Sequence, residues 1–149
     1  MKASLFRLVM NAYPPYLGTG VWVKRVSPDY RELDVELGLH WYNRNWVGTH
    51  FGGNLCAMAD PFYMLMLIPI LGRDYIVWDK ASCIDFVRPG RGRVYAEFRV
   101  TDQMLDQIKA ATAEGEKYEP KYPVNIHDGN GECIARVEKT MYIRRKRER

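Results

Sequence analysis

The segment Gly52–Leu71 constrains the fold of this chain more than any other part of the sequence. Polar and apolar residues do not alternate in it, and large apolar side chains such as Phe62 and Met66 recur at three- and four-residue steps. This spacing predicts a helix, and a helix that is apolar almost all round must be buried on most sides. Pro61 lies inside it and removes one main-chain hydrogen bond, so we expect a kink beside Asp60.

Strand-like segments before and after this helix can bury it. From residue 32 onward, Leu33, Val35 and Leu37 alternate with polar residues, the period of a strand with one buried face. Short helices are predicted at residues 4–13 and 102–115, the second capped by Asp102. An antiparallel sheet curled around one long apolar helix fits this order and gives an α+β class. The six predicted strands are residues 21–27, 32–40, 75–87, 93–101, 122–127 and 132–144.

Length and charge indicate one domain with a basic end. A chain of 149 residues supports one hydrophobic core, so residues 1–143 are predicted to form a single domain. The last six residues, 144–149, hold five basic groups and one acid and form a basic tail. The remaining 17 basic and 17 acidic residues balance, so no nucleic-acid partner is expected.

The three cysteines and the N-terminus indicate a location. The cysteines have no CxxC spacing, so neither a disulfide framework nor a zinc site is expected. We therefore expect a reducing compartment. The chain starts without the pattern of a signal peptide, and its longest unbroken apolar run, residues 62–71, is too short to span a bilayer. We therefore expect a cytoplasmic protein that makes no membrane contact.

Two motifs give the sequence a family resemblance. Residues 45–60 read NWVGTHFGGNLCAMAD, with Gly53 and Asp60 seven residues apart, and residues 86–92 read FVRPGRG. Both resemble signatures of hotdog-fold acyl-CoA thioesterases of the phenylacetate-pathway type: an Asn, a Gly, an HGG at the helix start and an acid seven residues on, then a strand ending in a proline and glycine turn. The resemblance covers residues 20–143. It implies a hotdog fold with its site between two subunits, and the edge strand that such a sheet leaves predicts a homodimer or homotetramer.

One position departs from the thioesterase pattern. Phe51 stands directly before the two glycines, where those thioesterases have His, and His50 lies one position earlier. A related group of hotdog domains of unknown function, with a GTxFGG-like motif, resembles this variation more closely. Two alternatives therefore stay open: a non-catalytic hotdog protein that binds an acyl ligand, and a hotdog hydratase or dehydratase, because His50-Phe51-Gly52 is similar to the HFPG of acyl-carrier-protein dehydratases.

The start of the apolar helix carries the predicted chemistry. A helix beginning at Gly52 and Gly53 presents free amides, and glycines let a carbonyl oxygen approach closely enough for them to stabilise an oxyanion. Asp60 could activate water or attack a thioester, or it could be a structural carboxylate. The resemblance implies that Asp60 faces the Gly52 and Gly53 amides of the partner subunit. Asn45 could bond the substrate carbonyl or brace the loop, and His50 is a further catalytic candidate.

The remaining candidates would bind an acyl-CoA substrate. Met58 and Phe62 would line the acyl tunnel, and Ser82 lies in a strand that could face the crevice. Arginines beside the glycine turn could hold the phosphates of coenzyme A, since guanidinium groups match phosphate geometry. No metal and no cofactor beyond the coenzyme A of the substrate are expected. The predicted substrate-binding residues are Phe51, Met58, Phe62, Ser82, Arg88 and Arg91.

Overall fold

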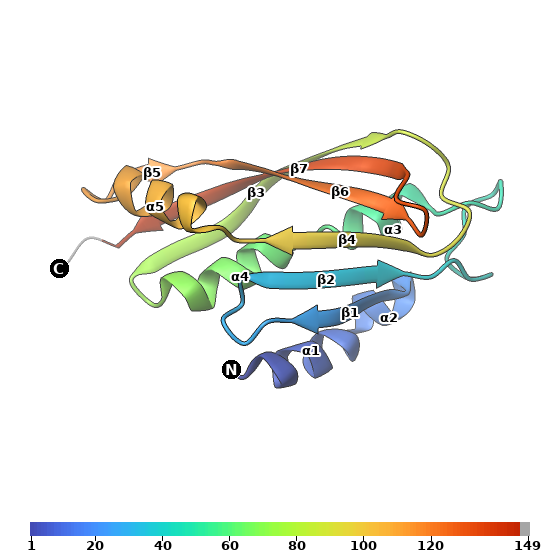
Figure 1. Cartoon of the computed structure of the whole chain (residues 1–149), viewed down its shortest axis with the longest axis horizontal. Coiled ribbons are helices and arrows are strands. Elements are labelled where there is room, and N and C mark those ends of the chain that lie inside the picture. The colour runs from blue at the N-terminus through green and yellow to red at the C-terminus, as the bar shows by residue number, and fades with distance from the viewer. Residues whose placement is uncertain (147–149) are drawn as a thin grey trace.

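An antiparallel sheet that curls around two helices dominates the computed structural model, which describes residues 1–146 (Figure 1). Its strands follow the order β1-β2-β4-β6-β7-β3, and β5 pairs with β7 outside this path. The predicted α+β arrangement is therefore confirmed. The strands are β1 (Val21–Val26), β2 (Glu32–Leu37), β3 (Tyr75–Phe86), β4 (Val94–Arg99), β5 (Lys117–Tyr118), β6 (Lys121–Asp128) and β7 (Cys133–Arg145).

The two edges of the sheet differ. At β1, the helix α1 (Ala3–Asn11) lies alongside, and the Asn11 side chain bonds the Val23 carbonyl at 3.0 Å and the Val23 amide at 2.7 Å. These bonds satisfy main-chain groups that an edge strand otherwise exposes. At the other edge, β3 runs for 12 residues and pairs with β7 on one side. This long strand is the sheet's open edge within residues 1–146.

The predicted central apolar helix is present, and the kink expected beside Asp60 is a complete break that divides it into two helices. Helices α3 (Gly52–Ala57) and α4 (Phe62–Leu71) are separated by a break in which the Asp60 amide bonds the Ala57 carbonyl at 3.2 Å. Pro61 has no amide to continue the helical pattern, so the chain turns and starts again. Asp60 thus lies between the helices rather than within one. By length and composition alone, Gly52–Leu71 is also apolar enough to cross a membrane.

Three smaller features were missed or misplaced. The sheet has a seventh strand, the two-residue β5, and a helix α2 (Pro14–Thr19) follows the paired prolines. Helix α5 (Asp102–Ala111) is capped by Thr101, whose hydroxyl accepts from the Met104 amide at 3.2 Å, and not by Asp102. Propensity ranks both residue types as caps, so local sequence could not choose between neighbours.

The basic tail begins later than predicted. Strand β7 continues through Arg144 and Arg145, and the Lys146 ammonium bonds the Arg73 carbonyl at 2.6 Å. Pairing with β3 extends to Arg145, which explains the longer strand. The rest of the predicted tail, residues 147–149, lies outside the described residues.

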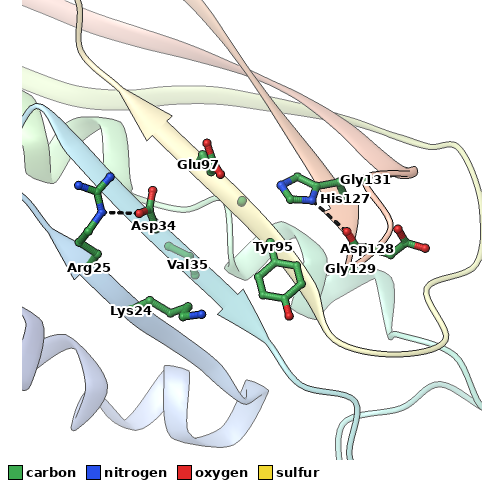
Figure 2. Close-up of a pocket in the computed structure, with 11 residues that line it drawn as sticks. Lys24, Arg25, Asp34, Val35, Tyr95, Glu97, His127, Asp128, Gly129 and Gly131 are labelled. Atoms are coloured by element: carbon green, nitrogen blue, oxygen red, sulfur yellow. Dashed lines mark hydrogen bonds and ion pairs between the residues drawn. The ribbon is translucent and has the colours of Figure 1, made fainter.

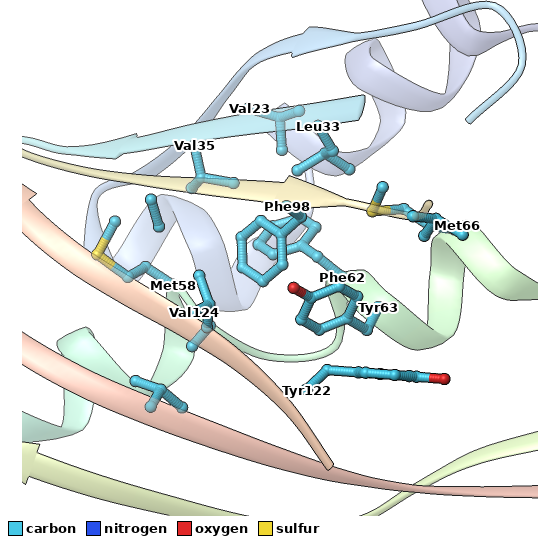
Figure 3. Packing of buried hydrophobic residues seen from close by; sticks show 14 of the residues in the cluster. Val23, Leu33, Val35, Met58, Phe62, Tyr63, Met66, Phe98, Tyr122 and Val124 are labelled. Atoms are coloured by element: carbon cyan, nitrogen blue, oxygen red, sulfur yellow. The ribbon is translucent and has the colours of Figure 1, made fainter. Parts of the chain in front are cut away.

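The core fills the space between the sheet and the two helices (Figure 3). Aromatic rings meet at its centre, where Phe62 of α4 lies 5.2 Å from Phe98 and 5.6 Å from Tyr16, measured between ring centroids. Met58 and Phe62 are both completely buried. The inward residues of β2 alternate as predicted, with Leu33, Val35 and Leu37 buried.

Candidate functional site

Asp60 is held at the helix break by a buried lysine. The Lys139 ammonium, on β7, lies 2.5 Å from Asp60 Oδ1 and 3.2 Å from Asp79 Oδ1 of β3. Lys139 is 1% exposed, whereas the Asp60 side chain keeps 55% of its surface accessible. The accessible Asp60 carboxylate is therefore fixed by the ammonium of a buried lysine.

A bulge in β3 turns further side chains toward this cluster. The pairing of β3 with β7 shifts register between Asp79 and Ala81, so Asp79 opposes Met141 and Ser82 opposes Lys139. Opposed residues share one face of a sheet, and a bulge changes the face that later residues occupy. Asp79 and Ser82, three positions apart, consequently point to the same inner face. The predicted candidate Ser82 thus lies on the same face as Lys139, on an exposed stretch of the open edge.

The electrostatics of the cluster follow from burial and from its two acids. Burial raises the pKa of Asp79, the nearby Asp60 charge adds to that increase, and the Lys139 ammonium opposes it. The Tyr16 hydroxyl donates to the Asp60 carbonyl at 2.5 Å, and its pKa is raised mainly by burial, so it stays protonated. Burial also raises the pKa of Cys56, which keeps this neighbour a thiol rather than a thiolate nucleophile.

Two phenylalanine rings lie against the predicted oxyanion site. Phe51 is the residue before α3, and a Cβ at Gly53 would stand 2.4 Å from its ring. A Cβ at Gly52 would stand 2.9 Å from the ring of Phe86. A side chain on either glycine would therefore have to displace an aromatic ring, and the amides of the two glycines begin a helix of six residues. Phe51 and Phe86 are each 55% exposed, so they form an apolar surface beside these amides.

Asn45 and His50 are used within the loop before α3. The Asn45 amide donates to Thr49 Oγ1 at 2.8 Å, and its oxygen accepts from the Val47 and Thr49 amides at 3.1 and 2.9 Å. The His50 ring is 4% exposed, and its Nε2 lies 2.6 Å from the Gly92 carbonyl. Asn45 thus braces the loop, and His50 ties the loop to the turn after β3.

His50 gives a pH-dependent stability. Burial lowers the pKa of His50, and its Nδ1 has no hydrogen-bond partner among residues 1–146. As the pH drops through about 6.5, the unfolded chain takes up a proton on this histidine before the folded chain does. The free energy of unfolding therefore decreases as the pH decreases, by at most about 1.4 kcal/mol per pH unit. We expect His50→Gln to flatten the fall in unfolding free energy between about pH 7 and 5.

Urea denaturation at several pH values measures this slope. His127→Gln is the control, because the half-buried His127 stacks on Tyr95. An unchanged slope in His50→Gln would contradict the assignment.

The predicted phosphate-binding arginines meet around one pocket. Arg88, Arg91 and Arg93 line a pocket of about 490 Å³ together with Asp128 and Glu132. Arg88 forms an ion pair with Glu132. Because His50 bonds Gly92 within the same turn, this basic pocket is fixed relative to the start of α3.

A further pocket, on the face of the sheet away from α3 and α4, shares Tyr95, Asp128 and Gly129 with the arginine pocket (Figure 2). It measures about 610 Å³ and is lined by residues such as Lys24, Tyr95 and His127. None of the predicted site residues lines it. Within the described part of the chain, no group of three or more His, Cys, Asp or Glu side chains could hold a metal ion.

The structure divides the predicted site residues into five groups. Asp60 and Ser82 face the Lys139 cluster, and Phe51, Gly52 and Gly53 lie at the start of α3. Met58 and Phe62 belong to the closed core. Asn45 and His50 brace the loop before α3, and Arg88 and Arg91 line the arginine pocket. Sequence reasoning missed Lys139 and Asp79. A signal for Lys139 exists, since it interrupts the apolar alternation of Val137, Met141 and Ile143 on β7.

Comparisons with known proteins agree on the fold. The family described as "Domain of unknown function (DUF4442)" matches residues 2–143. No curated protein sequence matches the chain. A protein of unknown function from Pseudomonas aeruginosa, called a probable thioesterase, superposes with a TM-score of 0.83 at 19% identity, covering 97% of both chains.

Two other solved structures are similar. A thioesterase from Haemophilus influenzae has a TM-score of 0.70 at 11% identity, with 99% of this chain and 94% of that chain covered. A protein of unknown function from Chlorobaculum tepidum has a TM-score of 0.73 at 13% identity, with 97% and 94% covered. At these identities the likeness concerns the fold, and the predicted hotdog fold is confirmed.

Proposed function

This chain belongs to the DUF4442 family, and from that premise we propose that it hydrolyses an acyl-CoA or related thioester at Asp60. The observation that carries the proposal is the position of this carboxylate. Asp60 lies at the break of the central helix, accessible to solvent, and is fixed by Lys139 at 2.5 Å. A fixed, accessible carboxylate is what a general base for water requires. The names of the solved relatives, probable thioesterase and thioesterase, agree with this chemistry.

The reaction divides between two places in the proposed site. Lys139 engages Oδ1 of Asp60, so we assign the other oxygen, Oδ2, to take a proton from water. That water adds to the thioester carbonyl carbon, and amides at Gly52 and Gly53 of the partner subunit would stabilise the oxyanion. The carbon–sulfur bond then breaks, and the coenzyme A thiolate leaves and takes up the proton.

A homodimer is part of this proposal. The open edge of β3, 12 residues long, and the exposed rings of Phe51 and Phe86 provide a surface for a second copy. Light scattering at micromolar concentration is expected to give about twice the 17.4 kDa mass of one chain, or four times for a tetramer. Amide hydrogen exchange should show protection along β3 that is lost on dilution. A monomer with fast exchange in β3 would remove the shared site.

The coenzyme A part of the substrate has a proposed place of its own. Arg88, Arg91 and Arg93 line the pocket together with Asp128 and Glu132, and Arg88 and Arg93 form ion pairs with Glu132 and Glu36. Arginine binds phosphate through paired donors. We therefore assign the nucleotide phosphates to this pocket, with the thioester directed toward Gly52.

The direct test is an assay of hydrolysis on a panel of short, medium, long and aromatic acyl-CoAs, in which the release of free thiol is measured. Cleavage of at least one with product acid formed supports the proposal. No cleavage of any member by folded protein would end it.

Non-catalytic binding of an acyl ligand is the second candidate, and the apolar surface of Phe51 and Phe86 favours it. A ligand that survives purification, together with no hydrolysis, would support it. The hydratase alternative is disfavoured by His50, because its ring is buried and bonded to Gly92.

A further inference from the structure

We propose that Lys139 is the positioning residue of Asp60: its ammonium holds one carboxylate oxygen and leaves the other free to bind water, with Asp79 as a second, buried carboxylate sharing the same ammonium. The catalytic consequence rests on the proposed thioester hydrolysis. The charge arrangement itself does not, and it can be measured without substrate.

The geometry leaves Lys139 no role on the surface. Lys139 is 1% exposed, and its ammonium contacts two carboxylates that come from different elements, the helix break and β3. A buried ammonium is costly unless it is paired and hydrogen-bonded. The shorter contact, 2.5 Å to Asp60 Oδ1, is a charge-assisted hydrogen bond. Lys139 therefore fixes one oxygen of Asp60 in direction as well as in charge.

Asp79 makes the cluster sensitive to the loss of Lys139. Both Asp79 oxygens are buried, and the Lys139 ammonium, 3.2 Å from Oδ1, is their ionic partner within residues 1–146. The Lys139 ammonium lies between Asp60 and Asp79. Without this ammonium the two carboxylates would face each other, and like charges disfavour ionisation of both. Asp60 would then keep its proton at a higher pH and could not act as a base there.

The other titratable groups around the cluster are neutral at ordinary pH. Tyr16 of α2 bonds the Asp60 carbonyl, and Cys56 of α3 senses both Lys139 and Asp60. Tyr122 of β6 is the register partner of Lys139, and burial raises its pKa. On β3, Ser82 opposes Lys139 and carries no charge. The balance at Asp60 is thus set by Lys139 and Asp79.

The experiment follows the Asp60 carboxyl carbon by NMR during an acid titration. Lys139→Met is expected to raise the midpoint of Asp60 by about one pH unit or more. Lys139→Arg, which keeps the charge, should restore most of the shift. Lys121→Met is the matched control, because Lys121 pairs with Glu138 at 2.8 Å on the exposed face. It should leave the midpoint unchanged.

A second pair of variants tests the inference if Lys139→Met alone fails to fold. Asp79→Asn should lower the Asp60 midpoint, and adding Lys139→Met to it should raise the midpoint again without leaving two unpaired acids. If the midpoint of Asp60 is the same in all folded variants, the inference is overturned, whatever the hydrolysis assays give. If hydrolysis is found, the acid limb of its pH profile should move with the NMR midpoint, and a limb that stays fixed would also overturn it. If wild-type protein cleaves no thioester, the proposed function fails while the titration still decides the role of Lys139.

Discussion

Asp60→Asn is expected to lower the turnover of acyl-CoA hydrolysis by a factor of about 100 or more, the usual scale for removing a general base. Asn keeps the volume of the side chain but cannot take a proton from water. Lys139 keeps Asp79 as an ionic partner at 3.2 Å, so its buried charge is not stranded. Substrate affinity should change much less, because binding would rest on apolar contacts and on the arginine pocket. Steady-state kinetics on the purified variant measures both quantities.

Stability measured on the same sample separates catalysis from structure. If Asp60 is a structural carboxylate, its substitution should lower the melting temperature and leave the rate per folded molecule unchanged. Asp85→Asn is the matched control, since Asp85 lies exposed on β3 and only approaches Arg136 at 4.0 Å. Gly53→Val tests the amide site independently, because its Cβ would meet the ring of Phe51 at 2.4 Å. Unchanged turnover by folded Asp60→Asn would contradict the mechanism.

The alternation of apolar residues predicted most of the sheet. Leu33, Val35 and Leu37 are buried on β2, and the strands predicted at residues 21–27, 32–40, 122–127 and 132–144 form the β1–β2 and β6–β7 pairs. Such periodicity is local, so each strand reports its own buried face. The apolar segment likewise predicted a helix that needed cover.

Features that depend on distant residues could not be predicted in this way. Asp60 meets Lys139, 79 positions along the chain, only because β7 lies across the helix break. The bulge that brings Asp79 and Ser82 to one face is a property of strand pairing, which alternation alone does not specify. The seven-residue interval from Gly53 located the carboxylate but not its partner. The sequence signal for this partner is Lys139 itself, a lysine at a strand position whose neighbours in the alternation are apolar.

Phe62→Ala is expected to lower the free energy of unfolding by about 3–5 kcal/mol, the range for truncating a buried phenylalanine. Phe62 is completely buried, with the rings of Tyr16 and Phe98 at 5.6 and 5.2 Å. Its removal would leave a cavity that these two rings cannot fill, because each is held by other contacts. Urea denaturation at fixed protein concentration measures the loss, since assembly adds to apparent stability.

The size of this loss decides between two roles for Phe62. A side chain that only lined an acyl tunnel would already border empty space, so its truncation would cost little stability and shift the preference toward longer acyl chains. A core side chain gives a large loss instead. Phe62→Leu should give a smaller loss, and Trp46→Ala, which alters a fully exposed ring, should change stability by less than about 0.5 kcal/mol. A Phe62→Ala variant as stable as the wild type would show that the closed core opens in solution, and would return Phe62 to the wall of the acyl site.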